Sequence, residues 1–442
     1  MIRQRRRGIV AAACLTVAAL AAAGCVPSAK PQQVASPGVT ASGTIEFWHF
    51  FTDREAEAIQ KVVDDFSAKF PQVKVIVKAG QEDAKMTQAI SAGQGPDVGL
   101  SYSTDIVGKF CSTGAWQDLT PYLTRDKVDL SDIPEPVQEY TAFQGKRCSL
   151  PFLADAYGFY YNKKMFAEAG ITSPPKTLSE LTAAAKKLTK KNADGSIKVA
   201  GFDPLSGYYE NSPAHFGAMG GAKWLTSDGK SALGSDPAWA ELLKWQKELV
   251  DFYGYDKISK FQSPFGDEFS PDNAFEKGQV AMNIDGEWRI ASIAADAPKD
   301  LDWEVAPLPV VDSKPELYGA GYVSGNVIGI SRNSKNPEAA WQFIKYLTTT
   351  TESVVKLANG IKNVPTLNSA LKSPELTTDA KSKVFTSIFA NPKSSTTPPC
   401  TCGTAYQDAA AQFFTDWQSG KVKDLPSGLN KLDDTVNQAI GG

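Results

Sequence analysis

From residue 44 onward, the hydrophobic positions switch repeatedly between a period of two, typical of strands, and a period near 3.6, typical of helices. The stretch "TIEFWHF" alternates as a strand does, and in the helical stretch after it Ile59, Val62 and Phe66 share one face. Two further strands, "VKVIVKA" and "DVGLSY", flank a second helical stretch, "KMTQAISAGQG". This β-α-β-α-β order predicts an α/β fold with a mostly parallel central sheet and helices on both faces. Ligands of such folds are expected at the carboxyl ends of the strands.

The same alternation continues through the rest of the chain. A strand is expected to run into a short helix at "YGFYYNKKMF", and a glycine-rich strand is expected at "GAGYVSGNVIGIS". Asn336 is expected to cap a helix whose first position is Pro337. Further helices are expected at 177–191, 236–253, 406–421 and 425–440. The 442-residue chain is too long for one ordinary core, so two domains or lobes are expected.

The first 24 residues are expected to be a secretory signal peptide (1–24). Four arginines within the first seven residues precede an uncharged, alanine-rich run that is too short for a comfortable membrane span. The run ends in "AAGC", which resembles the lipobox of bacterial lipoproteins and predicts cleavage before Cys25 and acylation of its thiol. Ala22 replaces the leucine that is usual in that motif, and ordinary secretion with unmodified Cys25 is the alternative. Residues 25–43, rich in Pro, Ser, Ala and Gln, are expected to form a flexible tether.

The charge balance argues against a nucleic-acid partner. The formal net charge is −3, and it becomes −7 when the arginines of the signal peptide are removed. A nucleic-acid surface needs clustered Lys and Arg. We therefore expect no nucleic acid among the partners.

Beyond residue 25, four cysteines remain: Cys111, Cys148, Cys400 and Cys402. An even number in an oxidising compartment indicates disulfides. Three pairings are possible, and we favour Cys111 with Cys148, which leaves the other two to each other in a C-x-C ring. A zinc site is the weaker alternative, because "PPCTC" is accompanied by no second C-x-x-C and no histidine cluster. We expect no metal and no cofactor.

Catalytic signatures are not found in the sequence. It has no G-x-S-x-G elbow, H-E-x-x-H or P-loop, and its two histidines, His49 and His215, have no recognisable triad partners. "GAGYVSG" imitates a dinucleotide loop, but its third glycine is one place late and a strand follows it. A glycosidase would need two carboxylates flanking one bond. Candidates for such a pair, which no spacing motif supports, are Asp105, Glu210, Asp285 and Glu287. We expect no enzyme activity.

Aromatic clusters at the ends of strands carry the most information about function: "WHFF", "SYS", "GYYEN", "GEWR" and "GYV". The C–H faces of pyranose rings pack on Trp and Tyr rings, and their hydroxyl groups pair with Asp, Glu, Asn and Arg. For any single aromatic, burial in the core is about as common as ligand contact. Trp48 and Trp288 are less easily explained by the core, because each follows a strand at a turn beside polar residues or glycine.

With these motifs, the chain resembles the extracellular solute-binding proteins of bacterial sugar importers, the family that includes maltose-binding protein. The stretches that carry the resemblance follow one another in the family's order along nearly all of the chain from residue 44. They are "IEFWHFFTDREAEAIQKVVDDFSAKFPQVKV", "ISAGQGPDVGLSY", "YGFYYNKKMFAEAGITSPPKTLSEL", "AFEKGQVAMNIDGEWRIA", "VAPLPV" and "NPEAAWQFIKYLTT". Each is loose alone, and the ordered set is specific.

The resemblance implies a two-lobed periplasmic-binding-protein-like fold, with a mostly parallel sheet flanked by helices in each lobe and a hinge between the lobes. It places the N-lobe at 44–150 and 307–362 and the C-lobe at 151–306 and 363–442, with crossings near 148–152, 306–310 and 362–366. The ligand-facing positions that it implies are Trp48, His49, Ser101, Ser103, Asp105, Tyr157, Tyr209, Glu210, Glu287, Trp288, Gly321 and Tyr322. Trp288 is the strongest of them, as a platform under a sugar ring. Ser101 stands where maltose-binding protein has an aromatic residue, which weakens the case for maltodextrins.

The function implied is that of a lipid-anchored binding protein on the outer face of the cell membrane. It would act as a monomer, capture a di- or oligosaccharide between its lobes, and deliver it to the permease subunits of an ABC transporter. Closure would follow from contacts that both lobes satisfy only together. The alternatives are a receptor for a non-sugar solute, such as a glycerophosphodiester or a polyamine, and, with less support, a secreted glycosidase.

Overall fold

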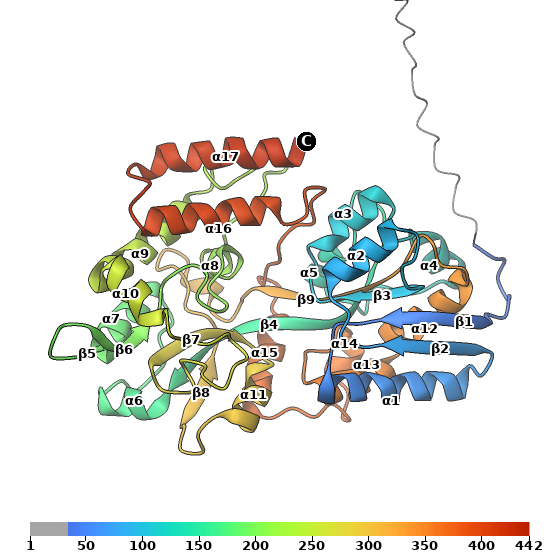
Figure 1. The fold of residues 1–442 in the computed structure, drawn as a ribbon, viewed down its shortest axis with the longest axis horizontal. Coiled ribbons are helices and arrows are strands. Elements are labelled where there is room, and N and C mark those ends of the chain that lie inside the picture. Colours follow the sequence, from blue (N-terminus) through green and yellow to red (C-terminus); the bar gives the residue numbers. More distant parts are fainter. Residues whose placement is uncertain (1–33, 442) are drawn as a thin grey trace, which may run out of the picture. The chain divides into compact units, whose positions relative to one another are not determined.

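The computed structural model describes residues 34–441 of the chain, so the signal peptide, Cys25 and the first part of the tether lie outside the described residues. The described part is an α/β fold with one mixed sheet and helices packed around it (Figure 1). The strands are β1 (Gly43–Trp48), β2 (Val73–Lys78), β3 (Val98–Ser101), β4 (Leu150–Asn162), β5 (Lys190–Lys191), β6 (Ile197–Phe202), β7 (Val280–Gly286), β8 (Trp303–Ala306) and β9 (Val323–Ile330).

The helices fall in two groups along the chain, separated by the long strand β4. Before it come α1 (Asp53–Lys69), α2 (Asp83–Ser91), α3 (Ile106–Thr113), α4 (Thr120–Asp126) and α5 (Glu135–Tyr140). After it come α6 (Lys163–Glu168), α7 (Leu178–Leu188), α8 (Pro213–Gly220), α9 (Pro237–Tyr253), α10 (Tyr255–Gln262), α11 (Arg289–Asp296), the 3-10 helix η1 (Pro315–Leu317), α12 (Pro337–Thr349), α13 (Thr351–Ile361), α14 (Asn368–Leu371), α15 (Ala380–Phe389), α16 (Ala405–Gln418) and α17 (Leu425–Gly441). The helices and strands expected from the hydrophobic periods are therefore present, except that the helix expected over 177–191 ends at Leu188, and Lys190–Lys191 form β5.

The strand order in the sheet is β2-β1-β3-β9-β4-β7-β6-β5, and β8 pairs with β4 beside this path. Parallel pairing is confined to β1 with β2, β1 with β3, and β6 with β7. The other pairs are antiparallel, so the expectation of a mostly parallel sheet is wrong in this respect. The reason is that β4 and β9 run in opposite directions through the middle of the sheet, and each pairs with strands on both of its sides.

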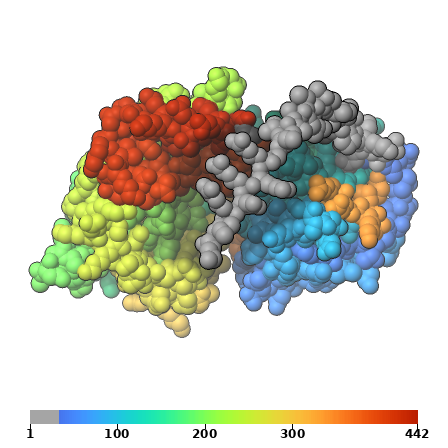
Figure 2. Space-filling model, turned by 45° about the horizontal axis from the view of Figure 1, so that its top comes forward, coloured from blue at the N-terminus to red at the C-terminus, as the bar shows by residue number. Residues whose placement is uncertain are grey.

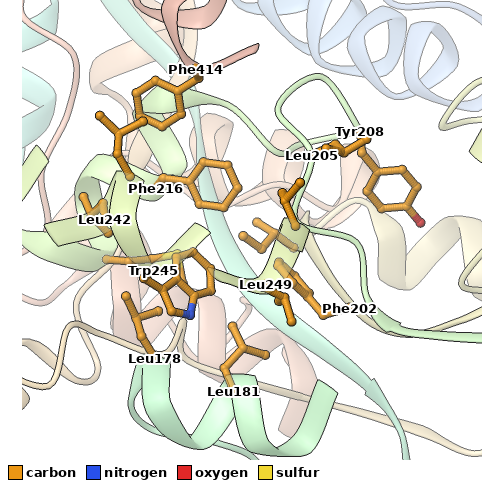
Figure 3. Packing of buried hydrophobic residues seen from close by; sticks show 14 of the residues in the cluster. Leu178, Leu181, Phe202, Leu205, Tyr208, Phe216, Leu242, Trp245, Leu249 and Phe414 are labelled. Carbon is orange, nitrogen blue, oxygen red and sulfur yellow. The ribbon is translucent and has the colours of Figure 1, made fainter. Parts of the chain in front are cut away.

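We call β1–β3 with α1–α5 and α12–α14 the first lobe, and β5–β8 with α6–α11, α16 and α17 the second lobe. Each has its own hydrophobic core. Phe47 and Phe66 pack against Phe343 in the first lobe, at ring separations of 5.2 and 5.0 Å. In the second lobe, Phe202, Trp245 and their neighbours fill the space between the sheet and its helices (Figure 3). These two cores account for most of the apolar periodicity of the sequence.

Three segments connect the lobes. Strands β4 and β9 pair with each other along their length, from Leu150 opposite Ile328 to Ala156 opposite Val323. The third segment passes beside β4, where Ala154 and Val364 exchange two backbone hydrogen bonds of 2.9 and 3.0 Å. A hinge with several crossings is thus present, and two of them are neighbouring strands of one sheet.

Two disulfides are formed, between Cys111 and Cys148 and between Cys400 and Cys402. The favoured pairing is confirmed. Asn336 occupies the N-cap position of α12, but its side chain makes no capping hydrogen bond and instead donates to the carbonyl of Thr44, at 2.8 Å. No helix within residues 34–441 combines the length and the apolar character needed to cross a membrane.

Candidate functional site

A hollow of about 210 Å³ lies where the first lobe, the crossing strands and the second lobe meet. It is lined by Tyr102, Ser103, Thr104, Asp105, Tyr157, Ser212, Ala214, His215, Tyr322, Ser324 and Gln407. These residues come from the segment between β3 and α3, from β4, from the start of α8, from the residue before β9 and the beginning of β9, and from α16. The molecular surface is also hollowed between the blue part of the first lobe and the yellow part of the second lobe (Figure 2).

The wall from the first lobe is a chain of short polar side chains after β3. Ser101 is fully buried and donates its hydroxyl hydrogen to Asp83, at 2.6 Å, so it positions the turn rather than facing the hollow. Ser103 donates to Asp105, at 3.1 Å, and Gln407 of α16 donates its amide hydrogen to the other oxygen of Asp105, at 2.6 Å. Burial raises the pKa of Asp105, and it raises the pKa of Asp83 to about 6. The bond from Gln407 joins the two lobes across the hollow.

The opposite wall is aromatic. The Tyr157 ring lies 3.9 Å from the His215 ring, 5.5 Å from the Tyr322 ring, and 5.4 Å from the Trp288 ring, which meets it edge-on. The Tyr157 hydroxyl lies 3.5 Å from the hydroxyl of Ser324, and the Tyr322 hydroxyl is hydrogen bonded to that of Thr397. Burial raises the pKa of both tyrosines, so their hydroxyl groups are neutral donors and acceptors at physiological pH.

His215 lies in the first turn of α8, which begins after the N-cap residue Ser212. Its Nδ1 is hydrogen bonded to the carbonyl oxygen of Glu210. A carbonyl only accepts, so Nδ1 carries the hydrogen and Nε2 is left as an acceptor. Burial lowers the pKa of His215 to about 4, so the ring is uncharged near neutral pH.

A network of buried acidic groups lies behind the aromatic wall and is organised by Arg289. The guanidinium group pairs with Glu268, Asp285 and Glu276, at 3.0, 2.7 and 3.3 Å. Glu268 also accepts from the indole N–H of Trp288, at 3.2 Å, which fixes that ring. Because Arg289 is almost fully buried, these carboxyl groups compensate its charge and hold the turn after β7.

Two pairs of carboxyl groups extend this network. Glu210 is hydrogen bonded to Glu268, and Glu287 is hydrogen bonded to Asp155 of β4. Burial raises the pKa of Glu210 and Glu287 well above the usual range, and it raises the pKa of Asp155 to about 7. Burial thus favours the protonated forms of Glu210 and Glu287, because two carboxylates that lie side by side in a buried site repel each other. Glu287 also accepts from the backbone N–H of Ala156, at 2.9 Å, and so ties the second lobe to the crossing strand.

Four of the residues expected from the sequence line the hollow: Ser103, Asp105, Tyr157 and Tyr322. Trp288, Glu210 and Glu287 stand directly behind its wall through the contacts with Tyr157, His215 and Ala156. Ser101 supports the wall from the first lobe through its bonds to Asp83 and Ser103.

The other expected residues lie away from the hollow. Trp48 is buried, its indole N–H bonds to Glu46, and the ammonium groups of Lys78 and Lys85 lie 5.4 and 5.6 Å from its ring. His49 is 1% exposed between two phenylalanine rings, and burial lowers its pKa to about 4.

Tyr209 and Gly321 also serve the local structure. The Tyr209 hydroxyl accepts from the backbone N–H of Ala274, at 3.0 Å. Gly321 is held by Ser394 and Ser395, and a side chain at this position would meet Ile388. Both residues shape the loops around the site.

Sequence patterns placed Tyr102 in an aromatic cluster at a strand end but not among the ligand-facing residues, and they did not single out Ser212, Ser324 and Gln407. His215 was considered only for a catalytic triad and for a zinc site. Gln407 reaches Asp105 across 302 positions of the chain, and no local pattern signals such a contact. The proline after Ser212 marks the start of a helix, and this local signal places His215 in the first turn of that helix.

Comparison with known proteins agrees with this geometry. Residues 52–352 match the family described as bacterial extracellular solute-binding protein. The maltotriose-binding protein of Pyrococcus abyssi is 29% identical over 345 residues, which cover 76% of this chain and 70% of that protein. The diacetylchitobiose binding protein DasA of Streptomyces coelicolor is 28% identical over 320 residues, 70% of each chain. The solved structure of CpMnBP1 with mannotriose bound has a TM-score of 0.76 and 27% identity, and the match covers 89% of this chain and 99% of that one. The fold is therefore the two-lobed α/β architecture of such binding proteins.

Proposed function

Because the chain belongs to the family of bacterial extracellular solute-binding proteins, we propose that it is the substrate-binding protein of an ABC sugar importer. It captures a di- or oligosaccharide between its two lobes and delivers it to the permease subunits in the membrane. The observation that carries the proposal is the wall of Tyr157, His215 and Tyr322, backed by Trp288, which faces polar side chains of the first lobe. Similar proteins bind maltotriose, diacetylchitobiose and mannotriose, which supports an oligosaccharide as the ligand.

The chemistry of the hollow suits a neutral polyhydroxylated ligand. Its donors and acceptors are hydroxyl groups, a neutral imidazole, an amide and the carboxyl group of Asp105. Sugar hydroxyl groups both donate and accept, so they can satisfy all of these groups at once. The aromatic rings offer flat apolar faces for the C–H groups of a pyranose.

The non-sugar alternative is less well supported. A glycerophosphodiester carries a negative charge, and phosphate is usually bound by Arg, Lys or a helix N-terminus. Among the described residues that line the hollow there is no lysine and no arginine, and at the start of α8 the backbone N–H of His215 is already bonded to the Ser212 hydroxyl group. Arg289, which holds Glu268 behind the wall, is paired with three carboxyl groups.

A glycosidase would need a second carboxyl group across the reacting bond. Among the described lining residues, only Asp105 carries one. Glu210 and Glu287 are engaged in their own hydrogen-bonded pairs behind the wall. The arrangement supports capture of a ligand without a reaction.

Closure of the lobes is the proposed mechanism of capture. Asp105 of the first lobe bonds to Gln407 of the second lobe, and the backbone of Cys400 lies against Gly108 of α3. A ligand that contacts both walls favours the conformation in which these contacts form, and so shifts the equilibrium towards it. The closed form is the one that we propose docks on the permease.

We also propose that Cys25 carries a lipid anchor and that residues 25–43 tether the binding unit to the outer face of the membrane. The lipobox-like end of the signal sequence supports this part of the proposal. The expected site of acylation precedes the first element of the fold, β1, by 18 residues, from Cys25 to Gly43. Part of this segment is held against the first lobe, since the N–H of Ala35 donates to Glu338, at 2.8 Å, and its carbonyl oxygen accepts from Arg125, at 3.1 Å.

A thermal-shift screen against mannotriose, maltotriose, diacetylchitobiose and further oligosaccharides tests the proposed function. Binding to the native state stabilises it by an amount that grows with the logarithm of the ligand concentration above the Kd, so at least one glycan is expected to raise the melting temperature. Glycerophosphocholine and spermidine serve as non-sugar controls. A shift with one of these controls and with none of the glycans contradicts the proposal.

A further inference from the structure

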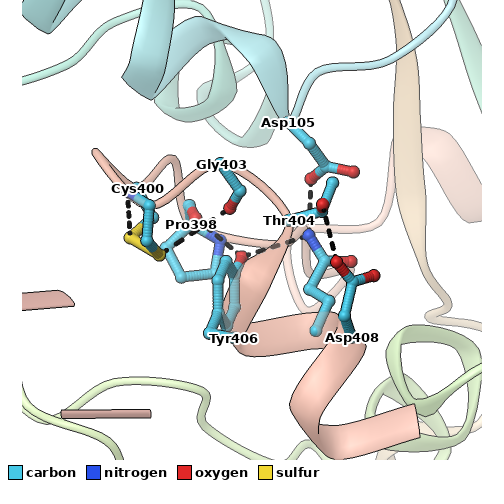
Figure 4. Close-up of a disulfide and its surroundings, with 9 residues drawn as sticks. Asp105, Pro398, Cys400, Gly403, Thr404, Tyr406 and Asp408 are labelled. Carbon is cyan, nitrogen blue, oxygen red and sulfur yellow. Dashed lines mark hydrogen bonds between the residues drawn. A yellow bond between two sulfur atoms is a disulfide. The ribbon is translucent and has the colours of Figure 1, made fainter. Parts of the chain in front are cut away.

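The disulfide between Cys400 and Cys402 lies where the two lobes touch beside the hollow (Figure 4). It belongs to residues 398–404, which we call the C-x-C loop and which lead directly into α16 of the second lobe. A Cβ atom on Gly108 of α3 would lie only 2.2 Å from the carbonyl oxygen of Cys400, so the backbone of the loop rests directly on the first lobe. The C-x-C loop is therefore part of the contact between the lobes.

The C-x-C loop also positions the side chain that reaches across to the first lobe. The N–H of Gly403 donates to the carbonyl of Cys400, at 3.1 Å, within the turn that precedes α16. Gln407, in the first turn of that helix, donates to Asp105 in the wall of the hollow, at 2.6 Å. A change in the backbone of the loop is therefore transmitted to the bond between Gln407 and Asp105.

The two disulfides within residues 34–441 differ in their exposure. Cys111 and Cys148 are 3% and 1% exposed. In the C-x-C loop, Cys400 is buried, whereas Cys402 is partly exposed and Thr401 between them is exposed. A thiolate that breaks a disulfide has to reach one of its two sulfur atoms. Cys402 is therefore the half of either disulfide that is most open to such an attack.

The two disulfides also differ in the length of chain that they close. Cys111 and Cys148 are 37 positions apart, whereas Cys400 and Cys402 are 2 positions apart. The chain entropy that a disulfide removes from the unfolded state grows with the length of the closed loop. The C-x-C disulfide thus adds little to the stability of the fold, and by the same linkage the fold protects it little against reduction.

A hydrogen bond inside the C-x-C loop favours one direction of attack. The backbone N–H of Cys402 donates to Sγ of Cys400, at 3.1 Å. A donor at a sulfur atom stabilises negative charge on it, and a thiol leaves a disulfide faster when its thiolate is stabilised. Attack on Cys402 therefore releases Cys400 as a stabilised thiolate.

We propose that Cys400–Cys402 is a site of reversible reduction by a dithiol, and that its reduction weakens sugar capture. With the disulfide open, the loop no longer keeps its shape against Gly108, and Gln407 is held less firmly against Asp105. The conformation in which the lobes touch is then less favoured, so a ligand between them binds more weakly. The redox site stands on its own, and the effect on capture rests on the proposed function.

The reduction is a balanced exchange of thiols and disulfides. A thiolate of the dithiol attacks Sγ of Cys402, the bond between the two cysteines breaks, and Cys400 leaves as a thiolate that takes up a proton. The second thiolate of the dithiol then attacks its own sulfur in the mixed disulfide and releases Cys402, which also takes up a proton. Two electrons and two protons thus pass to the loop, and the dithiol becomes a disulfide.

Graded reduction of the mature protein tests the redox site. The protein is incubated at increasing ratios of reduced to oxidised dithiothreitol, free thiols are alkylated, and mass spectrometry counts the labels on each cysteine peptide. We expect Cys400 and Cys402 to be labelled at a ratio about tenfold lower than Cys111 and Cys148, which serve as the internal control. Reduction of both disulfides at the same ratio, or of Cys111–Cys148 first, would overturn the inference.

Reduced thioredoxin in place of dithiothreitol distinguishes two kinds of dithiol. Labelling of the C-x-C loop with both reagents shows that a protein dithiol can reach Cys402. Labelling with dithiothreitol alone assigns the site to a small dithiol.

Calorimetric titration tests the effect on capture, with a glycan that the thermal-shift screen identifies. The oxidised protein is compared with protein reduced at the C-x-C loop alone and with the double variant Cys400→Ser/Cys402→Ser. The last two are expected to bind the glycan about fivefold more weakly than the oxidised protein. Reoxidation is expected to restore the affinity of the reduced protein, whereas dithiothreitol should not change that of the double variant.

The outcomes separate this inference from the proposed function. If the C-x-C loop is reduced first but the affinity stays within twofold, the effect on capture is overturned, and the redox site and the proposed function stand. If the unaltered protein binds no glycan of the panel, the proposed function and the effect on capture fail, and the order of reduction still decides the redox site. The reduced unaltered protein carries the test if the double variant does not fold.

Discussion

Burial determines the chemistry of individual residues at this site more than their residue type does. The two histidines are both neutral near physiological pH because both are buried, yet His49 is surrounded by phenylalanine rings while His215 lies in the wall of the hollow. Trp48 is the last residue of β1 and Trp288 follows β7, and a ring contact with a lining residue is formed by Trp288. Sequence patterns could show that these side chains stand at strand ends. They could not show which of them face the ligand, because that depends on the partners that distant segments supply.

Trp288 is the residue whose removal should weaken sugar binding most directly. Its ring is oriented by Glu268 and packs over Gly286, where even a Cβ atom would lie 2.2 Å from the ring. Trp288→Ala removes the ring that supports Tyr157 from behind the wall and is expected to weaken glycan binding at least tenfold, about 1.4 kcal/mol. Trp288→Phe keeps a ring without the N–H and should retain part of the affinity. Isothermal titration calorimetry measures both, and unchanged affinity in the alanine variant would remove Trp288 from the site.

Asp155 should make the stability of the protein depend on pH. Burial raises its pKa to about 7, and the carboxyl group of Glu287 and the amide of Asn363 hold it at the crossing strand. The folded state therefore retains a proton that the unfolded state releases near pH 4, so the free energy of unfolding falls as the pH rises from about 4 to about 7. One such group contributes at most about 1.4 kcal/mol per pH unit.

Asp155→Asn tests this origin, because the amide oxygen can accept from Glu287 as the carboxylate does, whereas the amide cannot titrate. Chemical denaturation at a series of pH values is expected to show a shallower decline for the variant than for the unaltered protein. Equal slopes for both proteins would contradict the assignment of the proton to this pair.

At the level of elements, the sequence predicted the helices and strands well because their hydrophobic periods are local properties. The direction of pairing in the middle of the sheet was mispredicted because β4 and β9 meet across more than 160 positions of the chain, as Ala156 and Val323 do. The return crossing was expected near 306–310. In the structure, Leu308 and Val311 pack in the core of the second lobe. The strand that returns to the first lobe is β9, which pairs with β3 of that lobe on one side and with β4 on the other.

The contact between α3 and the segment before α16 links the lobes at the level of elements (Figure 4). The disulfide of Cys400 and Cys402 closes a small ring there, and Tyr406 donates to the carbonyl of Pro398, at 2.8 Å. Gln407 then reaches Asp105 from the first turn of α16. The segment is thus held in a fixed shape where it meets the proposed sugar site.

Gly108→Ala should disturb this contact, because a Cβ atom at residue 108 would lie 2.2 Å from the carbonyl oxygen of Cys400. Backbone atoms on both sides must move apart, which is expected to cost about 1–3 kcal/mol. Sugar affinity should fall as well, since Asp105 and Gln407 separate. Gly441→Ala, at a helical glycine with no atom near its Cβ position, is the matched control. Thermal melts and glycan titrations that match for the two variants would show that α3 and this segment do not act together.

At the scale of the whole molecule, the hollow is built jointly by the two lobes and the strands that cross between them. The first lobe supplies polar side chains, the second supplies aromatic rings, and Asp105 and Gln407 join them. The two-lobed architecture could be predicted from the sequence, because the ordered motifs resemble those of a family with this fold. The particular lining of the hollow follows only from the packing of segments that lie hundreds of residues apart.

Isothermal titration calorimetry of the mature protein with mannotriose, maltotriose and diacetylchitobiose tests the central claim most directly. The account predicts saturable one-to-one binding of at least one of these glycans or of a related oligosaccharide. After the titration, the solution in the calorimeter cell should contain no product of hydrolysis. It would be contradicted by the absence of binding to every glycan tested, or by turnover of a glycan that binds.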